Sequence, residues 1–190
     1  MDKHKLIIFD ADGTLRRTTV EGQPCPDAPG EWELIPGVKQ KLSKIRWGSP
    51  SQGAVGFGVA SNQGGVERGY LSEDMARRLL EDMVAAVLDS KPEEGMVEYC
   101  PHSPDGGCGC RKPEPLMLQR LMARWGVRPE ETLFVGDMES DRGAAENAGV
   151  DFQWAHEFFG WDPARFAGLA PRALALLVDL IVFCAVFFPV

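Results

Sequence analysis

Residues 6–14 of this chain read Leu6-Ile7-Ile8-Phe9-Asp10-Ala11-Asp12-Gly13-Thr14. The four apolar residues predict a short buried strand, and the polar residues after them predict a turn at its carboxyl end. In an open α/β sheet, that end of a strand faces the ligand crevice. Asp10 and Asp12 lie two residues apart on an extended segment, so both point to one side, where a divalent cation would relieve their repulsion. The alternative is a plain Asp-Gly turn after a core strand, which needs no metal.

Length and composition suit one domain with room for a short appendage. The chain has 190 residues, of which 44% are hydrophobic, and a net charge of −8 at pH 7. Such an acidic chain lacks the basic footprint of a general nucleic-acid binder, so nucleic acid is disfavoured as a partner. The first strand begins soon after Met1, so we expect no signal peptide and a cytoplasmic location. In a reducing compartment, five cysteines favour metal binding over disulfides.

Strands and helices alternate along most of the chain. Short apolar runs predict strands at residues 6–9, 54–60, 96–99, 132–135 and near 152. Helical spacing of apolar residues predicts helices at residues 36–48, 72–87, 115–125 and 141–147. Residues 16–33 are polar and rich in Pro and Gly, and we expect a surface loop there, beside the crevice. The alternation predicts an α/β fold with a doubly wound parallel sheet and helices on both faces.

Three of the expected strands end in side chains that suit a metal-bound phosphate. These are Asp10 and Asp12 after the first strand, Ser61 and Asn62 after the second, and Asp137 with Asp141 after the fourth. Because the carboxyl ends of parallel strands share one edge of a sheet, we expect these groups to converge. Carboxylates and backbone carbonyls are ligands that Mg²⁺ prefers, so the sequence predicts a Mg²⁺ site at this edge.

These motifs make the chain resemble the phosphatases of the haloacid dehalogenase (HAD) superfamily over residues 5–155. The matching motifs are Asp10-Ala11-Asp12-Gly13-Thr14, Ser61-Asn62, Arg111-Lys112-Pro113, and Gly136-Asp137 with Asp141. The resemblance implies a Rossmann-like core in which Asp10 attacks phosphorus to form an aspartyl-phosphate. It assigns Asp12 the role of general acid and base. It also implies that Asp10, Asp137 and the carbonyl of Asp12 bind Mg²⁺. Asp141 is expected to contact these ligands instead of the ion.

The resemblance further implies cations and donors around the phosphoryl group. Lys112 and Ser61 would neutralise and orient the phosphoryl oxygens, which is most of what catalysis of phosphoryl transfer requires. Asn62 and Arg111 are expected to contribute to substrate binding. The expected ligand is a small-molecule phosphate ester, and we expect the chain to act as a monomer.

A second dense stretch, residues 100–110, reads Cys-Pro-His-Ser-Pro-Asp-Gly-Gly-Cys-Gly-Cys. An extended segment at its start and a Gly-Gly turn in its middle can bring four soft ligands to one point. The four ligands are Cys100, His102, Cys108 and Cys110. Three thiolates and one imidazole make a closed tetrahedral site, which predicts a structural Zn²⁺. The alternative is a set of incidental reduced cysteines.

The zinc loop resembles a narrower branch, HAD subfamily IIIA, with the zinc-containing relatives of heptose bisphosphate phosphatase and of the histidinol-phosphatase domain. The five residues between His102 and Cys108 are similar to the short loop of the histidinol phosphatases. Residues 61–70 resemble the heptose and polynucleotide-end phosphatases as much. The expected elements fill the intervals between the motifs, so we expect no large cap domain and an open site.

The predicted function is therefore a Mg²⁺-dependent phosphomonoester hydrolase for a small sugar or alcohol phosphate, such as heptose 1,7-bisphosphate or histidinol phosphate. One alternative is a polynucleotide 3′-end phosphatase. Another is a non-catalytic phosphate-binding or scaffolding protein on the same fold, against which the presence of Asp12 argues, because a binding protein needs no proton shuttle.

The end of the chain is almost wholly apolar. Residues 173–190 hold one charged residue, Asp179, and as a helix they would be about 27 Å long, close to the thickness of a bilayer core. We therefore divide the chain into a phosphatase domain, residues 1–167, and a tail, residues 168–190. The tail could be a membrane anchor, a helix packed on the domain or a poorly ordered extension. Asp179 argues against the anchor, because it would cost about 2.5–3.5 kcal/mol at the membrane centre.

Overall fold

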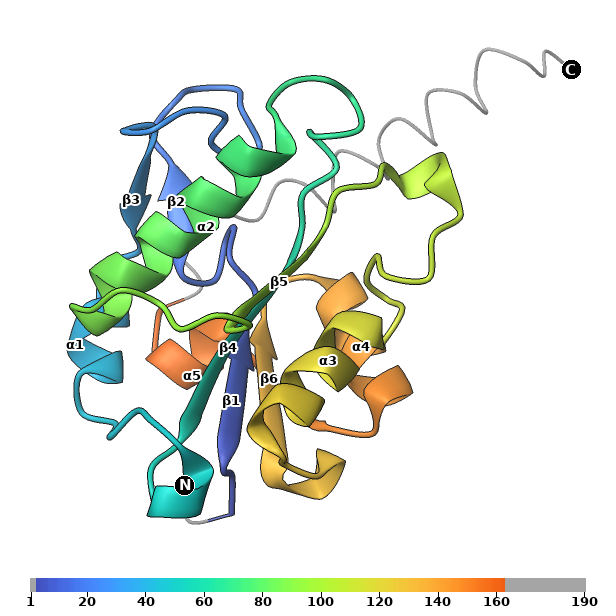
Figure 1. The fold of residues 1–190 in the computed structure, drawn as a ribbon. Helices are drawn as coiled ribbons and strands as arrows, with labels where there is room; N and C mark the ends of the chain where they lie inside the picture. Colours follow the sequence, from blue (N-terminus) through green and yellow to red (C-terminus); the bar gives the residue numbers. More distant parts are fainter. Residues whose placement is uncertain (1–2, 163–190) are drawn as a thin grey trace, which may run out of the picture. The chain divides into compact units, whose positions relative to one another are not determined.

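The fold is built on a parallel sheet of five strands (Figure 1). The computed structural model describes residues 3–162 of the chain. The strands of this sheet are β1 (Leu6–Phe9), β4 (Gly56–Asn62), β5 (Val97–Cys100), β6 (Thr132–Gly136) and β7 (Asp151–Trp154). They lie in the order β5-β4-β1-β6-β7, and each pairs with its neighbour in parallel. The parallel sheet expected from the sequence is confirmed.

The first strand occupies the centre of the sheet. Leu6 pairs with Gly56 of β4 on one side and with Thr132 of β6 on the other. All four residues of β1 are buried, because helices cover both faces of the sheet. The run of apolar residues in β1 is therefore that of a central strand, and Asp10 follows it directly at the carboxyl edge.

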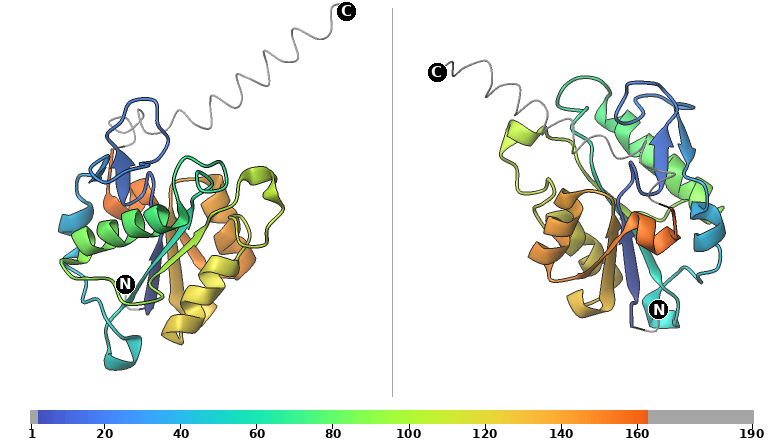
Figure 2. Two further views of the ribbon diagram at one scale, coloured as in Figure 1. Left: turned by 45° about the horizontal axis from the view of Figure 1, so that its top comes forward. Right: turned by 180° about the vertical axis from the view of Figure 1, so that it is seen from behind.

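Helices cover the two faces of the sheet (Figures 1 and 2). One face carries α1 (Val38–Leu42), α2 (Glu73–Leu88) and α5 (Ala155–Phe159), and the other carries α3 (Leu116–Trp125) and α4 (Glu139–Ala148). The start of α2 is the one predicted, since the Ser72 hydroxyl accepts a hydrogen bond of 3.2 Å from the backbone N–H of Met75. The predicted doubly wound α/β architecture is confirmed, and the described residues include no large cap domain.

The chain between β1 and α2 differs from expectation in two places. Residues 16–33 were expected to form a loop, but β2 (Arg16–Thr18) and β3 (Trp32–Leu34) pair there as an antiparallel ribbon. Strands of three residues are too short to show an alternating pattern. The first helix ends at Leu42 instead of near Gly48, because the Trp47 indole N–H and the Ile45 backbone N–H both donate to the Leu42 carbonyl and turn the chain.

Within residues 3–162, no helix combines the length and the apolar content needed to cross a membrane. The expectations for the apolar tail, residues 168–190, and for a domain boundary at residue 167 concern a part of the chain outside the described residues.

Candidate active site

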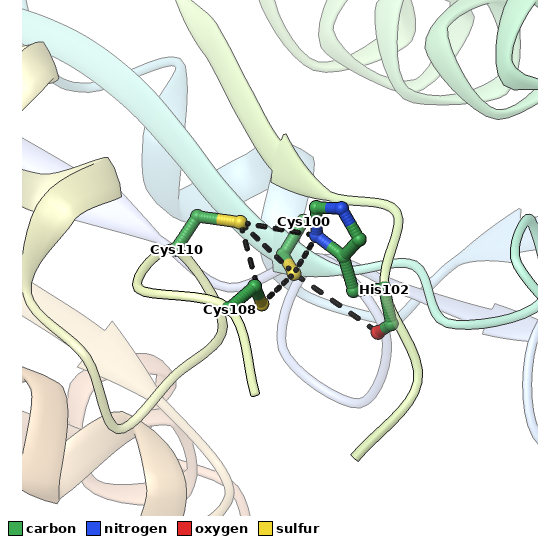
Figure 3. Close-up of side chains that lie close together, drawn as sticks. All are labelled: Cys100, His102, Cys108 and Cys110. Atoms are coloured by element: carbon green, nitrogen blue, oxygen red, sulfur yellow. Dashed lines mark hydrogen bonds between the residues drawn. The ribbon is translucent and has the colours of Figure 1, made fainter. Parts of the chain in front are cut away.

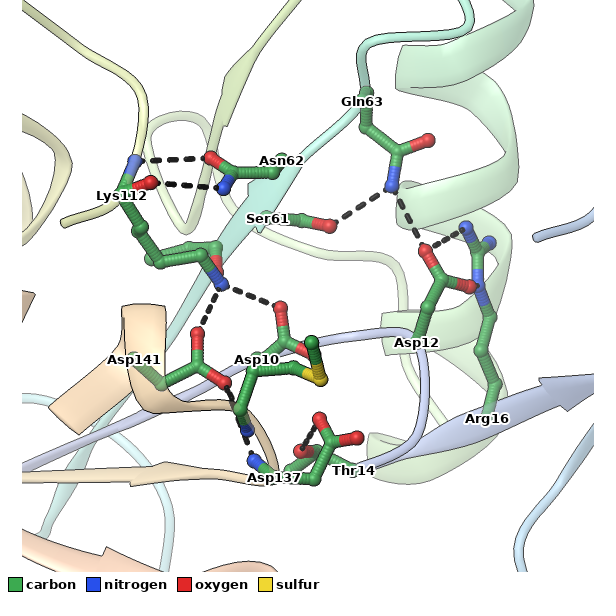
Figure 4. A network of polar contacts seen from close by, with 12 residues as sticks. Asp10, Asp12, Thr14, Arg16, Ser61, Asn62, Gln63, Lys112, Asp137 and Asp141 are labelled. Carbon is green, nitrogen blue, oxygen red and sulfur yellow. Dashed lines mark hydrogen bonds and ion pairs between the residues drawn. The ribbon is translucent and has the colours of Figure 1, made fainter. Parts of the chain in front are cut away.

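Four segments bring polar side chains to the carboxyl edge of the sheet (Figure 4). Asp10 follows β1, Ser61 and Asn62 end β4, Lys112 precedes α3, Asp137 follows β6, and Asp141 lies in the first turn of α4. Gly136 permits the close approach of α4, because a Cβ at this position would lie 2.5 Å from the Cβ of Asp141. Side chains that the sequence predicts for one site are therefore neighbours in space, although they come from distant parts of the chain.

The centre of the site is the buried ammonium group of Lys112. Its Nζ lies 2.5 Å from Asp10 Oδ1 and 2.7 Å from Asp141 Oδ1, and it donates to the Ala60 carbonyl at 2.8 Å. The contacts with Asp10 and the Ala60 carbonyl are hydrogen bonds, and the contact with Asp141 is an ion pair. The lysine residue, only 4% exposed, therefore joins the ends of β1, β4 and α4.

The carboxyl groups of the site have perturbed pKa values. Burial raises the pKa of Asp10 well above its usual range, with the charges of Asp141 and Asp137 adding to the rise and Lys112 opposing it. Burial and the charge of Asp141 raise the pKa of Asp137 to about 6. Burial acts to lower the pKa of Lys112, but Asp10 and Asp141 outweigh it and raise that pKa. One buried cation thus faces three carboxylates, which leaves the cluster with excess negative charge.

This acidic cluster fits a divalent cation. Asp10, Asp137 and Asp141 can each offer one carboxylate oxygen, and these oxygens lie within 4.8 Å of one another. An all-oxygen, negatively charged donor set suits a hard cation such as Mg²⁺. The sequence placed Asp141 behind the metal ligands, whereas the structure places it among the three carboxylates that could bind the ion. Its Oδ2 also accepts the backbone N–H groups of Asp137 and Met138.

The side chain of Asp12 lies on the other side of Asp10, in a separate network (Figure 4). Its Oδ1 accepts a hydrogen bond of 2.9 Å from Nε of Arg16, and its Oδ2 accepts one of 2.9 Å from Nε2 of Gln63. The same Gln63 nitrogen donates to the Ser61 hydroxyl at 2.8 Å. Sequence reasoning missed both Arg16 and Gln63. The only signal was their position, since Gln63 follows Asn62 directly and Arg16 comes two residues after Thr14.

Asn62 and Arg111 make main-chain contacts in this structure. Asn62 accepts from the backbone N–H of Lys112 at 3.0 Å and donates to its carbonyl at 3.2 Å. The Arg111 guanidinium donates to the carbonyl of His102 at 2.8 Å. These contacts hold the segment that carries Lys112. The predicted role of Asn62 and Arg111 in substrate binding stays a prediction.

The cysteines and the histidine of residues 100–110 form a second cluster (Figure 3). Cys100 Sγ lies 3.5 Å from His102 Nδ1, 3.5 Å from Cys108 Sγ and 3.3 Å from Cys110 Sγ. Around a zinc ion with Zn–S bonds of 2.3 Å, tetrahedral ligands are separated by about 3.8 Å. These three distances are about 0.3–0.5 Å shorter than that separation, and the four groups together could hold a metal ion.

Comparison with known proteins identifies the family. A family model described as HAD-hydrolase-like matches residues 109–154. The D-glycero-beta-D-manno-heptose-1,7-bisphosphate 7-phosphatase of Pseudomonas putida is 33% identical over 146 residues, which cover 77% of this chain and 79% of the relative. This chain belongs to the haloacid dehalogenase superfamily. It is a phosphatase of that superfamily, as the motifs predicted. A second heptose-1,7-bisphosphate 7-phosphatase, from Pseudomonas aeruginosa, is 34% identical over 140 residues, which cover 74% of each chain.

A solved structure supports the fold of this phosphatase. The crystal structure of D,D-heptose 1,7-bisphosphate phosphatase from B. bronchiseptica, complexed with magnesium and phosphate, superposes with a TM-score of 0.65. The two sequences are 30% identical, and the match covers 78% of each chain.

Mg²⁺ should stabilise this phosphatase in a pH-dependent way. A carboxyl group whose pKa is higher in the folded than in the unfolded protein costs stability as the pH rises between the two values. For Asp137 that interval runs from the usual 3.8 to about 6. We therefore expect Mg²⁺ to raise the melting temperature more at pH 7.5 than at pH 5, where protons compete for the same oxygens.

Thermal unfolding with and without Mg²⁺, at constant ionic strength, measures this difference. The variant Asp137→Asn should lose most of the Mg²⁺ effect at pH 7.5. An equal Mg²⁺ shift at both pH values, or the same shift in the variant, would contradict the assignment of the cluster as a cation site.

Proposed function

We propose that this phosphatase hydrolyses a phosphate ester of a small sugar, with heptose 1,7-bisphosphate as substrate, through an aspartyl-phosphate on Asp10. The observation that carries the mechanism is the buried pair of Asp10 and Lys112 at the carboxyl edge of the sheet. Lys112 holds Oδ1 of Asp10, and Oδ2 is the oxygen that we assign to the attack on phosphorus. The names of the two Pseudomonas relatives and of the B. bronchiseptica structure support the substrate.

The residues of the site divide the chemistry between them. In the first half, the Asp10 carboxylate bonds to phosphorus while Asp12 gives a proton to the departing alcohol oxygen. In the second half, Asp12 takes a proton from water, which attacks phosphorus and releases Asp10. Ser61 Oγ and Lys112 Nζ are the donors that we assign to the phosphoryl oxygens, where charge develops. A Mg²⁺ ion held by Asp10, Asp137 and the carbonyl of Asp12, beside Asp141, would supply further charge neutralisation.

The described residues include no large cap domain, so a small sugar is not selected through enclosure by such a domain. A panel of esters therefore tests the substrate, and it should include heptose 1,7-bisphosphate, histidinol phosphate and a 3′-phosphorylated oligonucleotide. We expect kcat/KM for the heptose ester to exceed the others by about tenfold or more. A higher kcat/KM for either of the other two would overturn the substrate and leave the mechanism standing.

Substitution of the two motif carboxylates should separate the half-reactions. Asp10→Asn should abolish turnover with the fold intact, because an amide oxygen is a poor nucleophile. Asp12→Asn should still form phosphoenzyme from an ester with a good leaving group, such as p-nitrophenyl phosphate, but should hydrolyse it slowly. Rapid acid quenching, with the protein-bound phosphate counted, measures both. Wild-type turnover by Asp10→Asn would contradict the mechanism.

We also propose that Cys100, His102, Cys108 and Cys110 bind a structural Zn²⁺. Arg111 and Lys112 follow the last of these ligands directly. Placement of catalytic groups must hold to within about 0.5 Å, and a metal bound by all four ligands would fix the two ends of this Gly-rich loop to each other. The metal would thus act on catalysis through the position of Lys112.

Loss of the zinc site should therefore lower activity even though no zinc ligand is assigned to the substrate. We expect Cys108→Ser to bind less zinc and to have a lower kcat that added Mg²⁺ does not restore, because the two ions use different ligands. Cys25→Ser, outside the cluster, is the matched control and should behave as the wild type. Bound metal and turnover should be measured on one sample. Full activity in zinc-free protein would refute the coupling.

A further inference from the structure

Arg16 is an unusual residue for the inside of a protein. It is the largest of the fully buried side chains among the described residues, with 0% of its surface exposed. A buried charge is costly unless it is paired and hydrogen-bonded, so a fully buried arginine marks a place where its contacts matter. The mechanism proposed above assigns no role to Arg16.

The guanidinium group of Arg16 spans the carboxylate of Asp12. Its Nε donates to Oδ1 at 2.9 Å, and its second terminal nitrogen lies 3.4 Å from Oδ2. The remaining terminal nitrogen donates at 2.8 Å to the carbonyl of Leu79, inside α2. The guanidinium fork is thereby fixed on two sides, to the carboxylate of Asp12 and to the α2 helix.

Every contact described for the Asp12 carboxylate comes from a hydrogen-bond donor. Arg16 approaches both oxygens, and the Gln63 amide donates to Oδ2. An ionised carboxylate only accepts hydrogen bonds, whereas a protonated one must also donate. An arginine cannot accept a hydrogen bond, so this arrangement suits the form of Asp12 that takes up a proton and opposes the form that gives one away.

We propose that Arg16 is a positioning residue for the second half of the reaction. In that half, Arg16 holds Asp12 in place as the base that activates water. The inference rests on the proposed aspartyl-phosphate mechanism. In this step the water oxygen bonds to phosphorus, and the bond between phosphorus and the Asp10 oxygen breaks. The electron pair of that bond returns to the Asp10 carboxylate. The water proton passes to Asp12, and inorganic phosphate leaves.

The proposal predicts an unequal effect on the two half-reactions. Without the guanidinium group, the Asp12 carboxylate is no longer held as a hydrogen-bond acceptor. Hydrolysis of the phosphoenzyme should therefore slow more than its formation. With p-nitrophenyl phosphate, formation requires little acid catalysis because the leaving group is good. The phosphoenzyme of Arg16→Met should therefore accumulate, whereas a purely structural defect would slow turnover without accumulation.

The experiment compares Arg16→Met, Arg16→Lys and the control Arg17→Met by stopped-flow release of nitrophenolate and by acid quenching. Arg17 is the next residue of the same strand, and its partly exposed side chain pairs with Glu33. We expect Arg16→Met to show a burst close to one nitrophenolate per active site, followed by a kcat about tenfold or more below that of the wild type. Arg16→Lys, which restores the charge without the fork, should hydrolyse its phosphoenzyme at an intermediate rate. Arg17→Met should match the wild type.

Two outcomes would overturn the proposal: an unchanged kcat in Arg16→Met, or a reduced kcat with no accumulated phosphoenzyme. If Arg16→Met fails to fold, Arg16→Lys decides on the same criterion. Asp12→Asn, measured alongside, distinguishes a failure of the role proposed for Arg16 from a failure of the aspartyl-phosphate mechanism. Accumulation in Asp12→Asn but not in the Arg16 variants refutes only the role of Arg16. If no variant and no wild-type sample yields protein-bound phosphate during turnover, the aspartyl-phosphate itself is refuted.

Discussion

The site depends on one buried ion-pair arrangement, in which the ammonium of Lys112 is shared by Asp10 and Asp141. A buried lysine without partners would carry a large desolvation penalty, so these contacts must form for the elements around them to pack. Because Nζ also donates to the Ala60 carbonyl, the same group fixes the ends of β1, β4 and α4 with respect to one another. The excess of carboxylates over cations that remains suits a divalent ion.

The position of Lys112 is itself secured from two directions. On one side, Asn62 pairs with both main-chain groups of Lys112, which ties the residue to the end of β4. On the other side, the segment before it belongs to the Cys/His cluster, and the Arg111 guanidinium bonds the His102 carbonyl. The backbone N–H of Ser103 donates to the carboxylate of Glu67, which connects this loop to the chain after β4. A metal in the cluster would therefore stiffen a segment that already contacts the catalytic edge.

Much of this arrangement could be predicted from the sequence, because it follows from local pattern and topology. The apolar run of β1 indicates a central strand, and parallel strands bring residues such as Asp10 and Asp137 to one edge. The spacing of Cys100, His102, Cys108 and Cys110 predicts a compact cluster, which the structure contains.

The parts that could not be predicted depend on contacts between distant segments. Arg16 lies in a polar stretch whose local pattern suggests a surface loop, and its burial follows from partners on α2 and from Asp12. The early end of α1 likewise depends on Trp47, whose indole bonds back to the Leu42 carbonyl. Propensity and periodicity do not encode such contacts, so sequence reasoning located the carboxylates and Lys112 but missed Arg16 and Gln63, which bond Asp12.

The most direct measurement of the central claim is the identification of the residue that carries the phosphoryl group during turnover. Wild-type enzyme in steady state with substrate would be quenched in acid and reduced with borohydride, which converts an aspartyl-phosphate to homoserine, and the product would be located by peptide mass spectrometry. The account predicts homoserine at residue 10 and intact aspartates at residues 12, 137 and 141. A modification at any other residue, or none in enzyme shown to be turning over, would contradict it.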